Sequence, residues 1–117
     1  MLKKSLILLT LSIFASSALG QGVRTFRLFE PLTEQFIGCL YEKDAVEIVN
    51  ALSNNDPSVG VVKLQADLCR MVQWTVTYDK LIHVKVGKQG EHITVYRGKV
   101  NGKDIYVPMI GWTHEVI

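Results

Sequence analysis

Cysteine is scarce in this chain, with two residues among 117. Cys39 and Cys69 lack the close Cys-x-x-Cys spacing that is typical of redox pairs. Two cysteines in an oxidising compartment most simply form one structural disulfide, which we predict, with a redox pair as the alternative. Closing a loop of about 30 residues stabilises a folded domain by roughly 3.6 kcal/mol when the gain is treated as lost chain entropy.

Catalytic motifs are also missing. The chain has neither a Gly-x-Ser-x-Gly nucleophile elbow nor a His-Glu-x-x-His metal motif. A Cys–His nucleophile needs a free thiol, which the disulfide would not leave. Glu42, Asp44 and Glu47 come nearest to an acid/base group, but their positions fit the solvated face of a helix. We therefore predict no catalytic residue, no enzymatic activity and no cofactor.

No apolar run reaches the roughly 20 residues that a transmembrane helix needs. The first residues follow the plan of a secretory signal instead: Lys3 and Lys4, then an apolar segment from Ser5 to Phe14, then small residues. We predict cleavage after Gly20, with position 18 as the alternative, so that residues 1–20 are the signal and 21–117 form a single mature domain. No cysteine follows the apolar segment, which argues against a lipoprotein anchor. The expected location is the periplasm or the exterior.

The mature chain has no excess of either charge. The whole chain has 13 Lys and Arg against 11 Asp and Glu, and its net charge is +2. Lys3 and Lys4 leave with the signal, so the two signs balance. The first half is acidic and the second half is mildly basic. A strongly anionic partner such as nucleic acid is therefore not expected.

A helical unit between the two cysteines organises the rest of the chain. Its clearest part is a helix over 42–52, because apolar residues recur there at spacings of three and four. They are Tyr41, Ala45, Ile48, Val49 and Leu52. Asp56 and Pro57 then have the residue types of a helix start. The segment 57–66 remains open between helix and strand, since Val59, Val61 and Val62 suit either.

From Cys69 onward the apolar period becomes two, which is the signature of strands. One face of the first strand contains Val72, Trp74, Val76 and Tyr78, and the pattern continues through Ile82, Val84 and Val86. Loops at 87–90 and at Asn101-Gly102 predict two hairpins, because Asn-Gly tolerates positive backbone dihedrals. The segment 111–116 is expected to close the sheet.

The two hairpins place different faces of the shared strand inward. Ile93 and Val95 point inward from the first hairpin, whereas the second groups Tyr96 and Val100 with Ile105. We therefore predict a β-bulge or bend over 96–98, where Gly98 supplies flexibility. The expected fold is α+β: a short N-terminal helical unit over about 41–66, then a small antiparallel SH3-like barrel over about 69–116.

The segment before the first cysteine has no clean period. Residues 21–33 are expected to form an edge strand or an arm that ends at Pro31. Phe36, Ile37 and Leu40 are expected to bring the chain into the core beside Cys39.

Together, Cys39, Asp44-Ala45, Cys69 and a following small barrel give the chain a resemblance to a group of small exported bacterial proteins, most of unknown function. The resemblance covers about residues 39–109. It implies a disulfide-stapled helical unit and an SH3-like barrel, and it implies no functional residue.

Histidine is the only residue type that suggests a metal site. The hairpin predicted across the 87–90 loop pairs Lys85 with His92. In that register His83 lies diagonal to His92 on the same face of the sheet. A defined site needs three or four converging ligands, and Lys85 between the rings would repel a cation. Exposed surface histidines are the better interpretation, and we predict no metal.

A basic surface is the strongest binding candidate. Across Asn101-Gly102, Lys99 lies opposite Asp104 and Arg97 opposite Tyr106, with Lys85 nearby. Arg97, Lys99, Tyr106 and Lys85 would receive another envelope protein or a cell-wall component. We hypothesise an exported non-enzymatic binding module of the bacterial envelope. The alternative is a small inhibitor or immunity-type protein that plugs the cleft of an envelope hydrolase with the 87–90 loop.

Overall fold

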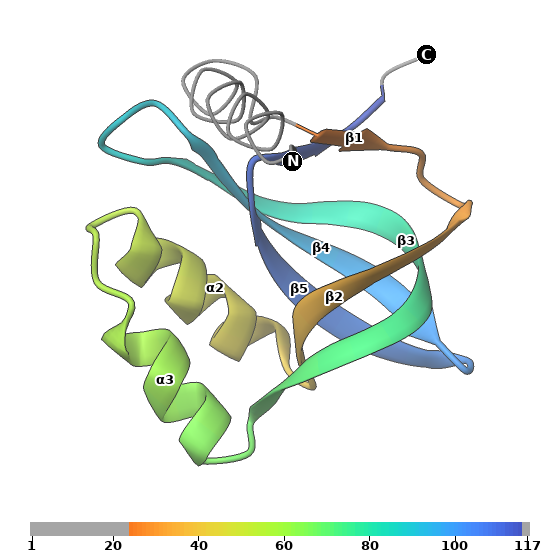
Figure 1. Ribbon diagram of the computed structural model, residues 1–117, viewed down its shortest axis with the longest axis horizontal. Coiled ribbons are helices and arrows are strands. Elements are labelled where there is room, and N and C mark those ends of the chain that lie inside the picture. The colour runs from red at the N-terminus through yellow and green to blue at the C-terminus, as the bar shows by residue number, and fades with distance from the viewer. Residues whose placement is uncertain (1–23, 116–117) are drawn as a thin grey trace, which may run out of the picture.

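The computed structural model describes residues 24–115, so the predicted signal and its cleavage site lie outside the described residues. In chain order the elements are β1 (Arg24–Phe26), β2 (Pro31–Cys39), α2 (Glu42–Leu52), α3 (Ser58–Gln65), β3 (Cys69–Val86), β4 (His92–Val100), β5 (Lys103–Ile110) and β6 (Trp112–His114). Figure 1 shows the two helices side by side against one flank of a strongly curved sheet.

The four longer strands form one antiparallel sheet in the order β2-β3-β4-β5. It closes on itself where Cys39 of β2 pairs with Tyr106 of β5. β3 pairs with β2 over its first half and with β4 over its second half, so this long strand bends around the centre of the molecule. The predicted α+β class and the antiparallel sheet are confirmed.

The helical unit lies within the sheet sequence and not ahead of it. β2 enters the sheet before α2 and α3, so the expectation of an N-terminal helical unit was wrong. Pro31 begins β2, whereas the sequence predicted that it would end a segment. A proline is tolerated at the first position of a strand because its missing N–H breaks no ladder bond there.

The disulfide between Cys39 and Cys69 is present, as predicted. The two residues are directly paired across β2 and β3, with their Cα atoms 4.1 Å apart. The bond therefore joins the two ends of the helical insertion at its base, and both cysteines are buried.

Two separate apolar cores lie on the two sides of the sheet. The interior core contains Phe26, Phe36, Val76, Tyr78, Tyr96, Val100, Ile105, Val107 and Met109. The helix-side core contains Cys39, Ala45, Ile48, Val49, Cys69, Ile93 and Val95. The apolar stripe of α2 thus covers the outside of the curved sheet.

These two cores explain why the two predicted hairpins placed different faces of β4 inward. Tyr96 and Val100 point into the interior core, whereas Ile93 and Val95 point outward beneath α2. Both faces of β4 are buried, so the strand does not need to change faces as we had expected. The register shifts lie in β3, where Asp79 and Ile82 are extra residues opposite the segment 95–98 of β4.

Gly98 acts through its size and not through flexibility. A Cβ atom at this position would lie 2.7 Å from Cγ2 of Val76 and 2.8 Å from Cδ1 of Tyr78. Real Cβ atoms do not approach other carbons this closely, because packed interiors leave no room for such overlap. The missing Cβ of Gly98 therefore leaves room for the Tyr78 ring beside β4.

The two hairpin registers differ in how well the sequence predicted them. Across Asn101-Gly102, whose φ values are 52° and 80°, Lys99 pairs with Asp104 as predicted. Across residues 87–91, Lys85 pairs with Ile93, one position away from the predicted partner. The observed register places Val84 beside Thr94 and Val86 beside His92, and both valines are exposed where a buried face was expected.

An ion pair joins the two helices. Lys63 of α3 places Nζ 2.8 Å from Oδ1 of Asp44 and also contacts Glu47, both on α2. Asp44 is 1% exposed, so its predicted place on a solvated face was wrong. The hydrogen bond to Asp44, followed by that to Glu47, raises the pKa of the Lys63 ammonium. A buried carboxylate is tolerated here because this cation faces it.

The segment that the sequence left open between helix and strand is helical, as α3. Oδ1 of Asp56 accepts hydrogen bonds from the backbone N–H of Ser58, at 3.0 Å, and from its hydroxyl. These bonds satisfy a donor in the first turn, where an α-helix has no internal partner. They also lower the pKa of Asp56.

Removing the disulfide should destabilise the fold without changing it. We expect the double substitution Cys39→Ser and Cys69→Ser to lower the free energy of unfolding by about 2 to 4 kcal/mol, because the unfolded chain gains conformational freedom. Urea denaturation followed by tryptophan fluorescence measures the loss. Reduction of the wild type with dithiothreitol should produce the same loss, and an unchanged midpoint in both experiments would contradict the structural role.

Lys63→Met should lower the melting temperature more than Lys43→Met. The first substitution leaves Asp44 buried without a cation, whereas Lys43 is exposed and has no ion pair among the described residues. Differential scanning calorimetry compares the two variants. Adding Asp44→Asn to Lys63→Met should recover part of the loss, and equal melting temperatures for the two lysine variants would argue against a stabilising pair.

Candidate functional site

The predicted basic surface is only partly assembled. Arg97 pairs with Tyr106, and Lys99 pairs with Asp104, on the outer side of β4 and β5. Lys85 does not join them, because it lies opposite Ile93, about 13 Å along β4 from Arg97 at 3.3 Å per residue.

The cations of this surface are already neutralised. Nε of Arg97 donates to Oδ1 of Asp79 at 2.9 Å, and Lys99 donates to Asp104. Asp79 is one of the two extra residues in β3, and such a bulge re-aims its side chain. The bond to Asp79 raises the pKa of Arg97, and the bond from Lys99 lowers the pKa of Asp104. The surface therefore presents two ion pairs and not two free cations.

The histidines do not form the arrangement that the metal hypothesis required. The corrected register places His83 opposite Val95 and His92 opposite Val86, on different faces of the hairpin. Nε2 of His83 lies 3.1 Å from Oδ1 of Asn50 on α2. Within residues 24–115, no cluster of three or more His, Cys, Asp and Glu side chains could hold a metal ion.

A hollow lies at one end of the interior core. Two adjoining cavities of about 310 and 270 Å³ share Leu40, Trp74 and Ile105. The β4–β5 hairpin completes the first cavity with Val100, Asn101, Lys103 and Asp104. The ends of β2 and β3 line the second with residues that include Gly38, Arg70 and Val72. We call the two cavities together the mouth pocket.

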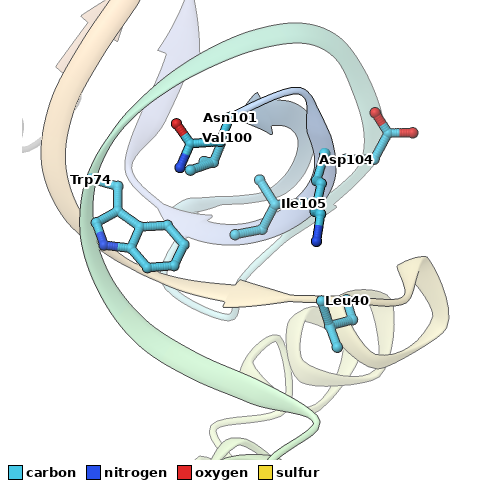
Figure 2. A pocket seen from close by; sticks show the side chains of 7 residues that line it. Leu40, Trp74, Val100, Asn101, Asp104 and Ile105 are labelled. Carbon is cyan, nitrogen blue, oxygen red and sulfur yellow. The ribbon is translucent and has the colours of Figure 1, made fainter.

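Trp74 and Ile105 face each other across the mouth pocket, as Figure 2 shows. Trp74 shares the inward face of β3 with Val72 and Val76, yet 53% of it is exposed because the core does not extend this far. Leu40 is 66% exposed at the end of β2, so its predicted place in the core was wrong. Large apolar side chains that are exposed next to one another mark binding sites more often than isolated exposed residues do.

The depth of the mouth pocket depends on Gly38. A Cβ atom at this position would lie 2.2 Å from Cδ1 of Ile105. Ile105 therefore occupies the space where a side chain of β2 would otherwise lie. Nothing in the sequence pattern pointed to this contact, because it joins residues on strands that pair only at Cys39 and Tyr106.

One end of the interior core is covered, unlike the mouth pocket. β1 pairs with β6 in parallel and places Phe26 against Tyr96, with ring centroids 4.9 Å apart. Trp112 of β6 packs on Phe36 at 5.9 Å. Within the described part of the chain, no such pair of strands covers Trp74, Val100 and Ile105.

The rim of the mouth pocket is polar and has one cation without an acidic partner. Arg70 donates two hydrogen bonds to Asp67, at 2.8 and 2.9 Å, which raise the pKa of Arg70. Asp104 is engaged by Lys99. Among residues 24–115, no carboxylate lies within ion-pair distance of Lys103.

The chemistry of the mouth pocket suits the binding of an apolar group. Its floor is apolar, and a few polar groups stand at the rim, which is the usual arrangement in sites that hold an apolar group by shape. It contains no nucleophile with an adjacent base. An aromatic or aliphatic side chain of a partner would gain most of its binding free energy from leaving water here.

Comparison with protein-family models, curated proteins and solved structures finds no match to this chain. Over the described residues, no helix has both the length and the apolar character needed to cross a membrane.

Two hydroxyl groups inside the molecule have no hydrogen-bond partner among the described residues. They are Oη of Tyr78 and Oγ1 of Thr94. Burial raises the pKa of Tyr78 well above its usual value of 10. Because the folded-state pKa is raised, the folded chain keeps this proton at a pH where the unfolded chain has lost it. The contribution to stability is complete below pH 10 and is lost as the pH rises further.

Tyr78→Phe should therefore flatten the alkaline loss of stability. We expect the free energy of unfolding at pH 7 to stay unchanged or to rise by about 1 kcal/mol, because an unpaired buried hydroxyl is removed. Urea denaturation between pH 7 and 11 measures both effects. Tyr41→Phe, at an exposed ring, serves as the control. A steeper alkaline loss in the Tyr78 variant than in the control would contradict this account.

Proposed function

We propose that the protein is an exported, non-enzymatic binding module that holds an apolar side chain of a partner protein in the mouth pocket. The observation that carries the proposal is the pair of adjoining cavities around the half-exposed Trp74, open at one end of an otherwise covered core. The partner is another envelope protein. No catalytic role and no cofactor belong to this proposal.

The proposed location is the periplasm or the exterior of a bacterial cell. Residues 1–20 have the sequence plan of a cleaved secretory signal. The Cys39–Cys69 disulfide is compatible with an oxidising compartment. Both observations fit a domain that would lose a large share of its stability in a reducing cytosol.

We further propose that the closed sheet is an SH3-like barrel with a helical insertion. The support is the sharply bent β3, which serves two neighbours in turn, and the closure of four strands around one interior core. The helices replace a loop between β2 and β3, and they pack on the outside of the sheet without blocking the mouth pocket.

The mouth pocket is a better candidate than the basic surface that the sequence suggested. Arg97 and Lys99 are committed to Asp79 and Asp104, and an anionic partner would have to compete with these carboxylates. Exposed ion pairs contribute little to affinity. Apolar side chains at the mouth have no such competitor.

A second candidate remains an inhibitor or immunity-type protein that inserts the β3–β4 hairpin loop into the cleft of a hydrolase. Glu91 holds this loop in shape, since its carboxylate accepts from the backbone N–H of Gln89 at 2.9 Å. The carbonyl of Glu91 also accepts from Gly87 at 2.8 Å. Figure 1 shows the hairpin projecting from the sheet above α2.

Site-specific photo-cross-linking in the native envelope separates the two candidates. The photo-cross-linker benzoylphenylalanine replaces Trp74 in one variant and Lys88, at the hairpin tip, in another. The mouth-pocket proposal predicts a discrete adduct at position 74 and none at position 88. An adduct at position 88 alone would favour the inhibitor, and the absence of any adduct at 74 would contradict our proposal.

A pair of matched substitutions tests whether an adduct at position 74 is specific. Leu40→Asp places a charge in the mouth pocket and should abolish the adduct. Val86→Asp places the same charge at a similarly exposed position on the β3–β4 hairpin and should leave the adduct intact. Equal melting temperatures for both variants exclude a general loss of structure.

A further inference from the structure

The first half of β3 has a strand on one edge only. β2 pairs with β3 over Cys69–Thr77, and β4 pairs with it from Thr77 onward on the other edge. Along residues 70–76, no described strand occupies the β4 side. The backbone N–H and C=O groups that point to this side are therefore free to pair with another chain.

This free edge borders the mouth pocket. Arg70, Val72 and Trp74 line the pocket from alternate positions of β3. Met71, between them, belongs to the opposite face and is 54% exposed. A chain lying along the edge would thus have the pocket beneath every second residue.

An added strand would continue the line of β4. β4 runs antiparallel to β3, and its pairing ends at Thr77 and Lys99 because the chain turns away at Asn101-Gly102. A segment that pairs antiparallel with residues 70–76 takes the place that β4 leaves. Since side chains alternate between faces, its residues at positions i and i+2 would enter the mouth pocket.

The charge of the rim indicates the polar part of the partner. Lys103 lies on the rim with no carboxylate within ion-pair distance among the described residues, whereas Arg70 and Asp104 have their own partners. An acidic side chain beside the apolar ones would find one cation at this rim that has no ion-pair partner among residues 24–115. A basic side chain of the partner would find no carboxylate at this rim that lacks a partner of its own in the described part of the chain.

We propose that the segment 70–76 of β3 accepts an extended segment of the partner protein as an added antiparallel strand. The partner's segment has apolar side chains at alternate positions and an aspartate or glutamate that reaches Lys103. This inference rests on the proposed function, because it specifies how a partner would occupy the mouth pocket. Backbone pairing supplies binding free energy at the edge, and the pocket supplies selectivity.

Selection from a random library tests the inference without knowledge of the natural partner. The disulfide-intact mature protein is panned against phage-displayed 12-residue peptides, and enriched peptides are synthesised. We expect them to share apolar residues spaced by two, with an acidic residue close by. Hydrogen–deuterium exchange should show new protection of amides within residues 70–76 when such a peptide binds.

Chemical variants of one enriched peptide separate backbone pairing from simple insertion of a side chain. N-methylation at alternate residues should weaken binding at least tenfold in one register and leave it unchanged in the other. Lys103→Ala should weaken binding several-fold, with Lys88→Ala as a matched control at an exposed site. Equal tolerance of N-methylation in both registers would overturn strand addition.

The outcomes for the two proposals differ. If peptides bind and change Trp74 fluorescence but leave the amides of residues 70–76 unprotected, strand addition is wrong and the mouth-pocket proposal stands. If panning enriches no peptide, strand addition is overturned, and the photo-cross-linking at position 74 decides the mouth pocket separately. If the peptide-free protein sediments as a dimer with these amides protected, the occupant is a second copy and the inference is overturned.

Discussion

The position of Cys39 is the constraint on which the rest of the structure depends. This residue pairs with Cys69 of β3, to which it is bonded, and with Tyr106 of β5. It therefore ends β2, closes the sheet and begins the excursion into the helices. Cys39 also belongs to the same buried cluster as Ala45 and Val49 of α2, so the helical layer packs at the same point. Sheet closure and helix docking share one covalent link.

Sequence periodicity predicted the parts of the fold where one face is apolar and the other polar. The stripe of α2 and the strands around Asn101-Gly102 belong to this group. β2 was missed because Glu34 and Gly38 interrupt the inward face that contains Phe36. The apolar and polar alternation by which a short strand is predicted is therefore weak. β4 was misread because it is buried on both faces, and periodicity cannot assign a strand to two cores at once.

The candidate site was less predictable than the fold. Pairing across the Asn-Gly turn correctly placed Arg97 and Lys99, but their neutralisation depends on Asp79, which reaches Arg97 because of a bulge that no local pattern indicates. The alternation of β3 alone predicts that Trp74 is a core residue. Trp74 is exposed because β4 stops pairing with β3 at Thr77 and does not cover it. Sites formed where strands stop pairing are set by tertiary geometry and not by residue order.

The contact between Gly38 and Ile105 has a consequence for how the chain can evolve. A methyl group at position 38 would need the space that Cδ1 of Ile105 now fills. Growth of one side chain must therefore be matched by shrinkage of the other, and relatives that keep this strand order should vary at the two positions together. Because both residues line the mouth pocket, such coupled changes would alter its shape while leaving the pairing of Cys39 with Tyr106 intact.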